Sequence, residues 1–341
     1  MVRATPSTFR FRDCRPREPP WWWKIPLELS EACSNDVKIA VLAGGVGGAK
    51  LSHGLYRIHP RDLTVIVNTG DDFRLHGLFI SPDLDTVLYT LAEWADPVQG
   101  WGLQGDTQIC AQQLARLGGE TWFRLGDLDL ATHLFRTQRL SQGATLSQVT
   151  EELARAAGLQ VRLLPMCDEP VPTQLRLASG WVDFQDYFVR RQHSDPVLEC
   201  RYQGADQTPP AAGVVEALMA AERIVLAPSN PFLSLQPIFS LRGFETLWGS
   251  CSARKVAVSP MIGQAAVKGP LASLLASLGQ PVNSLGIARL LQNWIHVLIL
   301  DEGDAALVPD IEKLGIQAVC IPTLMKTNQD RDRLARVALD V

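Results

Sequence analysis

Residues Val37–Leu51 read VKIAVLAGGVGGAKL, and this stretch decides the fold class. A short, β-branched apolar run over 37–43 stops at a glycine cluster at 44–48. Apolar residues then recur at helical spacing over 49–58. The order strand, glycine loop, helix is the opening unit of a parallel α/β sheet.

The same unit recurs along the chain. Further buried-strand patterns occur at 63–67, 223–227, 255–259, 297–300 and 317–321. Helical spacing occurs near 85–94, 107–117, 146–157, 270–278, 308–314 and 331–339. Repeated strand and helix units predict an α/β fold with a doubly wound, Rossmann-like parallel sheet.

The middle of the chain departs from this alternation. A candidate strand at 159–164 is followed by a hairpin pattern in which 173–177 and 181–184 flank a Ser-Gly turn. We therefore expect one α/β domain over 37–341 with a smaller inserted α+β subdomain at about 120–215.

Two segments are predicted to be irregular. Residues 1–36 alternate arginine with proline, lack the apolar stretch of a signal peptide and are expected to be a disordered extension. The alternative is a docking segment led by Trp21–Trp23, which would bury a large aromatic area against a partner. Residues 194–213, rich in Pro, Gly and polar side chains, are predicted to form a mobile loop or lid.

Composition excludes several classes of protein. The seven cysteines are scattered and never form a CxxC pair, so a disulfide framework or a structural zinc site is not expected and a reducing cytosol fits best. A formal net charge of -4 leaves no basic surplus for a nucleic acid partner. The longest apolar runs, such as 294–300, are far shorter than the roughly 18 residues of a membrane span.

The glycine loop has the features of an anion-binding site. Glycines at a strand end let the backbone approach a phosphate beside the unpaired N–H groups of a helix. Gly44, Gly45, Gly47 and Gly48 are followed by Lys50, and the spacing is neither GxGxxG to its last position nor a Walker A loop. The alternative is a tight strand-to-helix turn; four glycines and a lysine favour anion binding.

Carboxylates follow the second strand. Asp71 and Asp72 come after Asn68, and Asp83 and Asp85 come at the start of the next helix. Such groups bind magnesium, which takes one or two carboxylates and substrate phosphates. The alternative is that each residue only caps a helix or closes an Asx turn.

A second acidic cluster reads RLGDLDLATH. It places Arg124 beside Asp127 and Asp129, and His133 follows. His133 has the chemistry of a general base, but a lone histidine is more often structural, and we favour that reading.

Two later strand-end loops add polar groups. Ser229 and Asn230 follow one strand, with donors suited to phosphate or base contacts, although a proline-rich turn is the alternative. Lys268 follows another strand and supplies a further cation.

Taken in order, the motifs resemble those of the 2-phospho-L-lactate transferase family. They are LAGGVGGAKL, VNTGDD, SPDLDTVLYTLA, GDT, LGDLDLATHL, LPMCDEPVPT, FQDYFVRR, APSNPFLSL, SPMIG with KGP, and PTLM. The match runs from about residue 37 to the end. Its specific part is SPDLDTVLYTL together with LGD-x-D-x-ATH, since glycine loops are common.

The resemblance implies a step of coenzyme F-420 biosynthesis in the cytoplasm. The terminal hydroxyl of the deazaflavin Fo attacks the phosphorus that bears the organic acid in a guanosine diphospho-linked donor. GMP leaves, and a 2-phospholactyl, phosphoenolpyruvyl or 3-phosphoglyceryl group stays on the acceptor. The resemblance also implies magnesium and a homodimer.

The resemblance assigns roles to the candidate residues. Asp85 and Arg124 match positions that contact the deazaflavin, and Asp72 and Asp85 are assigned to catalysis and to the metal, with Asp83 as a substitute for either. The predicted substrate contacts are Asp127, Asp129, Ser229, Asn230 and Lys268, and the predicted nucleotide contacts are Gly44, Gly45, Gly47, Gly48, Lys50 and Asn68.

Four residues depart from the family's usual pattern, and two other functions are alternatives. Leu128, Cys167, Gln236 and Pro322 differ from the family's usual residues, and Gln236 leaves the acid of the donor open. A dehydrogenase is disfavoured because no ribose-binding acid is clearly placed about 20 residues after the loop. The stronger rival is a nucleotide-sugar-binding regulator of the gluconeogenesis-factor family, which typically carries a Gly/Ser-rich run where this chain has SPDLDTV.

Overall fold

Strand β1 (Ile39–Ala43) is buried over its whole length and packs on both of its faces. Ile39, Val41 and Ala43 belong to one apolar cluster, whereas Ala40 and Leu42 belong to the other. Because successive side chains of a strand point to opposite faces, both sides of β1 need a covering layer of helices. The apolar run thus specifies a central strand of a layered α/β protein.

The computed structural model describes residues 37–263, 265–266 and 269–341. Its main sheet has seven strands in the order β14-β13-β10-β9-β1-β2-β5, and every neighbouring pair is parallel. The other strands of this sheet are β2 (Leu63–Val67), β5 (Arg162–Pro165), β9 (Arg223–Leu226), β10 (Arg254–Val258), β13 (Val297–Leu300) and β14 (Gln317–Cys320). The predicted doubly wound fold is confirmed.

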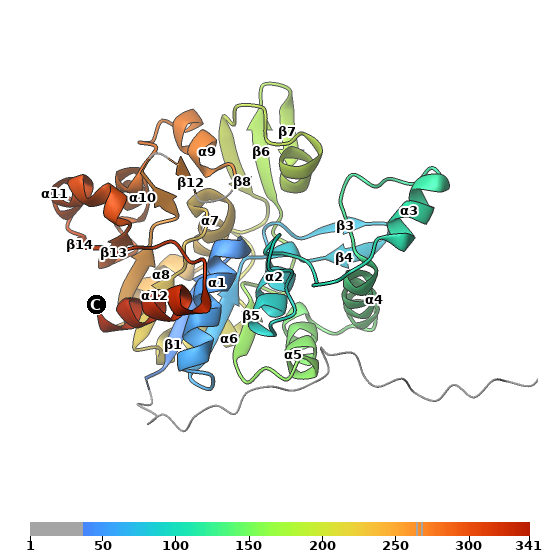
Figure 1. Ribbon diagram of the computed structural model, residues 1–341, viewed down its shortest axis with the longest axis horizontal. Helices are drawn as coiled ribbons and strands as arrows, with labels where there is room; N and C mark the ends of the chain where they lie inside the picture. The colour runs from blue at the N-terminus through green and yellow to red at the C-terminus, as the bar shows by residue number, and fades with distance from the viewer. Residues whose placement is uncertain (1–36, 264, 267–268) are drawn as a thin grey trace, which may run out of the picture. The chain divides into compact units, whose positions relative to one another are not determined.

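Helices cover both faces of the sheet (Figure 1). One face packs against α1 (Gly45–Ile58), α2 (Pro82–Leu91), α5 (Leu146–Ala156) and α12 (Asn328–Asp340). The other packs against α6 (Ala212–Ala220), α8 (Phe244–Ser250), α9 (Leu271–Ser277), α10 (Ser284–Leu291) and α11 (Val308–Glu312). Short helical segments complete this layer: η3 (Pro231–Leu235), α7 (Gln236–Phe239) and η4 (Glu302–Leu307).

Smaller elements lie beside the main sheet. A hairpin of β3 (Phe73–Leu75) and β4 (Leu78–Ile80) extends with α3 (Ile109–Arg116) and α4 (Asp127–Ser141) to the right in Figure 1. A three-stranded sheet has the order β7-β6-β8. Its strands are β6 (Thr173–Leu177), β7 (Gly180–Asp183) and β8 (Glu199–Tyr202), with η2 (Asp186–Arg190) between the last two, and β11 (Met261–Ile262) pairs with β12 (Ala265–Ala266).

The middle of the chain differs from the prediction in three places. The strand expected in the inserted subdomain, β5, is an edge strand of the main sheet, because its apolar side chains pack with those of β2. The predicted mobile segment 194–213 contains β8, which pairs with β6. The polar residues of β8 face outward from an edge strand, and this made the sequence resemble a loop. Helix α4 was not predicted at all.

The N-terminal extension predicted at 1–36 lies outside the described residues. Within the described part, no helix combines the length and the apolar character needed to cross a bilayer.

Candidate functional site

The site lies beyond the carboxyl ends of β1 and β9, which pair side by side in the sheet. From β1 the sheet runs outward through β2 to β5, and from β9 it runs the other way through β10 and β13 to β14. The strand order therefore reverses between β1 and β9, and ligands of open α/β sheets bind beyond the carboxyl ends of the strands at such a point. The segments 44–48, 68–72 and 227–230 leave β1, β2 and β9 at this edge.

Asp83 joins the two helices that start at this edge. The amide of Gly45 donates to its Oδ1 at 2.7 Å, and Asn68 Nδ2 donates to its Oδ2 at 2.9 Å. Asn68 Nδ2 also lies 3.2 Å from Asp71 Oδ1. The first N–H groups of a helix lack intrahelical partners and form its positive end. A carboxylate from the start of α2 thus accepts a hydrogen bond from the first amide of α1.

Ser229 joins the glycine loop to the loop after β9. The amide of Gly44 donates to Ser229 Oγ at 3.0 Å, and Ser229 Oγ donates to the Gly44 carbonyl at 2.9 Å. A Cβ at Gly47 would lie 2.4 Å from the Pro228 carbonyl oxygen, and one at Gly48 would lie 2.8 Å from Ser229 Oγ. Close approach of the two loops therefore requires glycine at both positions.

Four carboxylates gather next to this contact: Asp71, Asp72, Asp83 and Asp85. Burial raises the pKa of Asp71, and the negative charges of Asp83 and Asp72 raise it further. Burial also raises the pKa of Asp83, to about 6, against the hydrogen bonds from Asn68 and the Gly45 amide. The cluster carries more negative charge than its surroundings compensate, which is the electrostatic condition for binding a cation.

Asp72 has an oxygen with no partner. Ser81 Oγ donates to Asp72 Oδ2 at 2.9 Å, whereas Oδ1 is buried and accepts no hydrogen bond from the described residues. Burial raises the pKa of Asp72, opposed by the charge of Arg136 and by the Ser81 hydrogen bond. Buried polar atoms are almost always paired, so Oδ1 is a candidate ligand atom for a bound group.

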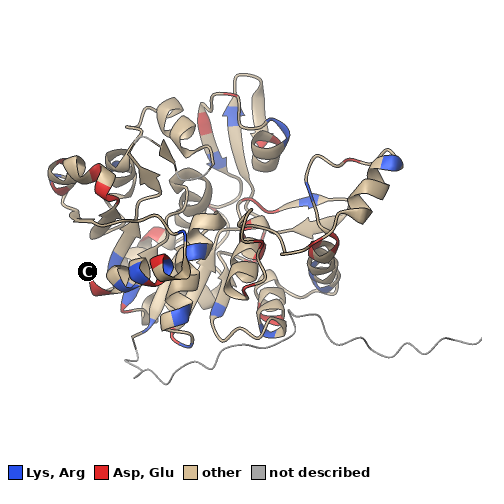
Figure 2. Ribbon diagram, in the orientation of Figure 1, with Lys and Arg blue, Asp and Glu red and all other residues tan. Residues whose placement is uncertain are grey.

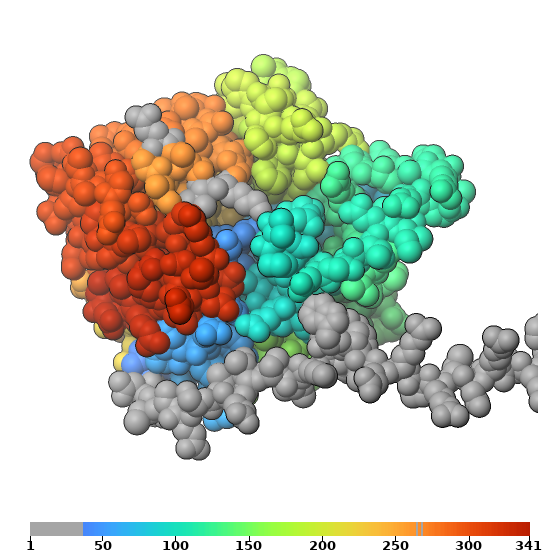
Figure 3. All heavy atoms as spheres, in the orientation of Figure 1, coloured from blue at the N-terminus to red at the C-terminus, as the bar shows by residue number. Residues whose placement is uncertain are grey.

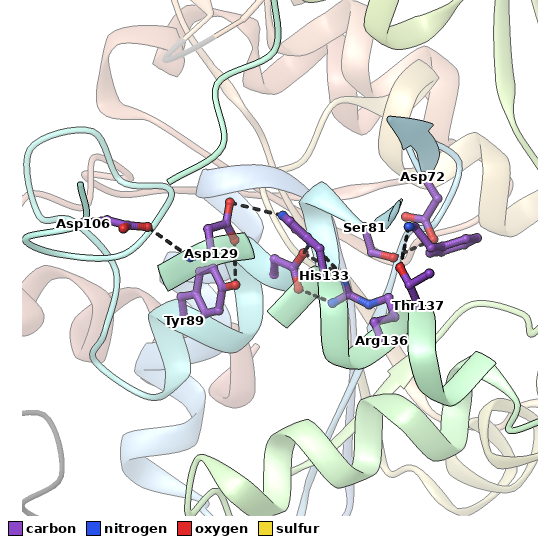
Figure 4. Close-up of polar contacts among 10 residues, drawn as sticks. Asp72, Ser81, Tyr89, Asp106, Asp129, His133, Arg136 and Thr137 are labelled. Carbon is purple, nitrogen blue, oxygen red and sulfur yellow. Dashed lines mark hydrogen bonds and ion pairs between the residues drawn. The ribbon is translucent and has the colours of Figure 1, made fainter. Parts of the chain in front are cut away.

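Asp85 is held by a buried arginine from α4, Arg136, which is labelled in Figure 4. Arg136, 1% exposed, donates from Nη1 to Asp85 Oδ2 at 3.1 Å and from Nη2 to Asp85 Oδ1. Nδ1 of His133 lies 3.3 Å from Arg136 Nη1 and 3.6 Å from Asp85 Oδ2. The other ring nitrogen, Nε2, lies 3.3 Å from Asp129 Oδ2, and Tyr89 donates its hydroxyl proton to Asp129 Oδ1 at 2.7 Å.

The segment around Asp106 and Asp127 is fixed by reciprocal capping. Asp106 accepts hydrogen bonds from the amides of Leu128 and Asp129 at the start of α4. Asp127 accepts hydrogen bonds from the amides of Ile109 and Cys110 at the start of α3. Figure 2 shows acidic ribbon segments at the start of α4 and beside β3. The carboxylate of Asp127 is therefore engaged in structure.

An aromatic cluster flanks the carboxylates. Phe73 directly follows Asp72, and its ring centroid lies 4.8 Å from that of Phe123 and 6.0 Å from that of Trp122. The guanidinium of Arg190 lies over the Trp122 ring, 4.8 Å from the centroid. Flat apolar surface thus lies next to the acidic cluster, as an aromatic ligand requires.

Two groups of side chains have ligands for a metal ion. Asp85, Asp129 and His133 offer ligand atoms within 4.8 Å of one another. Arg136, however, already contacts both Asp85 and His133, so a cation there would face a guanidinium. The unpartnered oxygen of Asp72, with Asp83 nearby, fits a hard cation better.

The family model described as "2-phospho-L-lactate transferase CofD" matches residues 39–323. The chain belongs to this family. It is 39% identical over 316 residues to a phosphoenolpyruvate transferase of Streptomyces griseus, covering 89% of this chain and 98% of the relative. It is 37% identical over 300 residues to a 2-phospho-L-lactate transferase of Methanosarcina mazei, covering 88% and 98%.

A solved structure shares the fold of this CofD family chain. A protein of the UPF0052 family from Bacillus halodurans superposes with a TM-score of 0.63 at 15% identity, covering 90% of this chain and all of that one. At this identity the likeness concerns the fold alone.

The structure brings together most of the residues that the sequence singled out in this CofD family chain. Hydrogen bonds join Gly44 to Ser229 and Asn68 to Asp83, and Asn230 caps η3 through Oδ1. Arg124 is exposed and forms no hydrogen bond or ion pair among the described residues. Lys268 lies outside the described residues.

Lys50 contacts the C-terminal segment of the chain. Its Nζ donates to the Met325 carbonyl at 3.2 Å, and it lines a cleft of about 410 Å³ together with residues of the C-terminal segment, such as Lys326 and Arg331. In Figure 3 the blue atoms of α1 are visible between the red C-terminal segment and the teal segment that follows α2. The predicted phosphate contact of Lys50 therefore has a competing structural partner.

Arg136, Tyr89 and Asp106 are not among the site residues predicted from the sequence. Arg136 follows Asp129 and His133 by seven and three positions, a spacing that places all three on one face of a helix. Gly126 before two acids and Arg139 near the end are helix boundary signals. Recognising α4 would have indicated the network.

Proposed function

We propose that this CofD family transferase moves an organic-acid phosphoryl group from a guanosine diphospho-linked donor to the terminal hydroxyl of the deazaflavin Fo in the cytoplasm. The hydroxyl oxygen bonds to the phosphorus that carries the organic acid, the bond from that phosphorus to the GMP oxygen breaks, and GMP leaves. The observation that carries the proposal is the buried carboxylate cluster at the strand-order reversal, within the region that matches the family model.

The proposed chemistry asks mainly for positioning and charge compensation, because phosphoryl transfer passes through a loose transition state. Asp85 is the proposed acceptor of the hydrogen bond from the attacking hydroxyl, whose proton leaves through it. Its two oxygens are oriented by Arg136. The orientation of the nucleophile is then set before the donor arrives.

We assign a magnesium ion to the acidic cluster. Asp72 would hold it through the unpartnered Oδ1, with Asp83 or Asp85 as second ligand. When bound, magnesium neutralises the negative charge that develops on the diphosphate. Asp83 is the better second ligand, because its oxygens accept from neutral donors, the Gly45 amide and the Asn68 side chain, whereas both oxygens of Asp85 are bonded to the positively charged Arg136.

The donor and the acceptor are proposed to bind on different sides of the cluster. We propose that Gly44–Gly48 and Asn68 contact the nucleotide and that Ser229 and Asn230 contact the donor's phosphates and acid. The acceptor side is formed by the aromatic cluster and Arg124, whose free guanidinium has no competing partner among the described residues.

We further propose that the protein is a homodimer. Large apolar side chains on α3, at its C-cap and on α4 are exposed, as a contact with a second copy requires: Ile109, Leu117, Leu128, Leu134 and Phe135. Sedimentation equilibrium at micromolar concentration measures the mass directly.

The test is an incubation with Fo, magnesium and, separately, the guanosine diphospho-linked derivative of 2-phospholactate, phosphoenolpyruvate or 3-phosphoglycerate. GMP release and the mass of the product are followed. Product from one donor establishes the reaction and names the acid. Donor binding without product from any of the three would favour the nucleotide-binding regulator.

A further inference from the structure

Asp85 contacts a buried network of side chains from α4 to which the proposed reaction assigns no role of its own. We propose that Arg136 and His133 are a positioning pair that holds the Asp85 carboxylate toward the attacking hydroxyl of the acceptor. The inference rests on the proposed transferase reaction, and it adds two residues of α4 to the site. Asp129 and Tyr89 fix the pair from the far side.

Arg136 determines how Asp85 is oriented. The two terminal nitrogens of its planar guanidinium each contact a different oxygen of Asp85. This two-pronged contact fixes rotation of the carboxylate as well as its position, which a single point charge would not do. Since Arg136 comes from α4 and Asp85 from the first turn of α2, the contact also sets the distance between the two helices at the site.

His133 determines how Arg136 is oriented, through its tautomer. A guanidinium has donors and no acceptor, so in the contact of 3.3 Å between Arg136 Nη1 and His133 Nδ1 the ring nitrogen accepts. A neutral His133 then carries its proton on Nε2, which faces Asp129 Oδ2 at 3.3 Å. That contact is electrostatic rather than an aligned hydrogen bond.

The network is a continuous chain of contacts between α2 and α4, in which Arg136 donates both to His133 and to Asp85. Tyr89 donates to Asp129, His133 faces Asp129 with Nε2, Arg136 donates to His133, and Arg136 donates to Asp85. Figure 4 shows these side chains in line from Tyr89 to Arg136, with Asp72 and Ser81 beyond. The network therefore ends at the acidic cluster.

A purely structural role explains this network poorly. His133 and Arg136 are each 1% exposed, and a buried ion pair usually stabilises a fold no better than apolar side chains of similar volume. The chain nevertheless places two carboxylates, an arginine and a histidine between two helices. Displacement of a nucleophile by about 1 Å costs on the order of 100-fold in rate, so rigid placement of Asp85 has a function in catalysis.

The first experiment separates positioning from binding and from folding. In Arg136→Lys the positive charge stays but the two-pronged contact is lost, and in His133→Gln the acceptor that orients Arg136 is altered. We expect kcat to fall by about 10-fold to 100-fold in each, with the KM for the donor within about twofold of wild type. The matched control is Arg139→Lys on the same helix. Arg139 pairs with Glu152 and lies outside the network. The kinetics of this variant should equal those of wild type.

The outcomes are distinct. Wild-type kcat in Arg136→Lys and His133→Gln, with or without a lower Tm, would overturn the positioning role. Absence of product with the wild-type protein and all three donors would instead overturn the proposed reaction. The same assay distinguishes the two, because the variants test the positioning role and the wild-type protein tests the reaction.

A second experiment tests the arrangement without any turnover. With ¹⁵N-labelled histidine, the ring nitrogen shifts report which nitrogen carries the proton, and the His133 signal is identified by its absence in His133→Gln. We expect the neutral ring in the wild-type protein to carry its proton on Nε2. A proton on Nδ1 would exclude donation from Arg136 to His133 and overturn the proposed pair.

Discussion

Asp83 accepts a hydrogen bond from the amide of Gly45 at 2.7 Å, so the start of α2 caps the start of α1. These two residues are 38 positions apart in the chain and meet at the carboxyl edge of the sheet. The glycine loop is thus held by a carboxylate of the protein itself. A donor phosphate approaching Gly45 would meet Asp83, and a cation between the two would relieve their repulsion.

Removing the Asp83 carboxylate should destabilise the fold measurably. In Asp83→Ala the Gly45 amide and the Asn68 side chain lose an acceptor, and we expect a loss of about 1–3 kcal/mol in the free energy of unfolding. Asp83→Asn keeps one oxygen acceptor and should lose less. Urea unfolding of the three proteins measures this, and equal midpoints for Ala and wild type would show that the cap contributes nothing.

Gly47→Ala should be strongly destabilising. Its Cβ would lie 2.4 Å from the Pro228 carbonyl oxygen, a backbone atom that cannot rotate away. We expect a lower Tm and lost donor binding, because the loops after β1 and β9 must separate. The control is Gly249→Ala on α8, where a Cβ meets no atom within 4 Å and alanine favours the helix by up to about 1 kcal/mol. If both variants have the wild-type Tm, the close loop contact is not required.

The sequence predicted the sheet and the place of the site because both depend on local signals. The β-branched run of 37–43, the glycines after it and Asp71 and Asp72 after β2 are visible without tertiary information. What could not be predicted is which carboxylate meets which partner. Asp83 and Asp85 are separated by one position, yet one caps α1 and the other pairs with Arg136. That difference depends on the packing of α4 against α2.

Two substitutions at Asp127 distinguish a structural role of its carboxylate from a role in substrate binding. Its carboxylate accepts hydrogen bonds from the amides of Ile109 and Cys110. The hydrogen bonds from Thr107 and from these amides lower the pKa of Asp127. Asparagine is nearly as good a helix cap, so Asp127→Asn should keep activity and Tm, whereas Asp127→Ala should lower both. Loss of activity in Asp127→Asn at unchanged Tm would instead show that the substrate contacts the negative charge.

Magnesium should stabilise the free protein through Asp72. At a concentration about 100 times its Kd, a ligand that binds only the folded state adds about 2.7 kcal/mol, so Tm should rise when magnesium is added and fall back with EDTA. Asp72→Asn should abolish most of this shift, because the unpartnered oxygen loses its charge. Asp310→Asn, on the surface beside Lys313, is the control and should shift like wild type. If magnesium raises the Tm of Asp72→Asn as much as that of wild type, the ion binds at another place.

Asp85→Asn should abolish transfer, and the structure adds that it should also destabilise the protein. The amide cannot pair with the charge of Arg136, which is buried, and breaking one partner of a buried ion pair costs about 3–5 kcal/mol. Removing both charges in Asp85→Asn with Arg136→Met should restore part of the lost stability without restoring turnover. Urea unfolding and GMP release on the same preparations separate the two effects. Turnover at the wild-type rate by Asp85→Asn would exclude Asp85 from the reaction, and a double variant less stable than the single one would show that Arg136 contributes to the fold independently of Asp85.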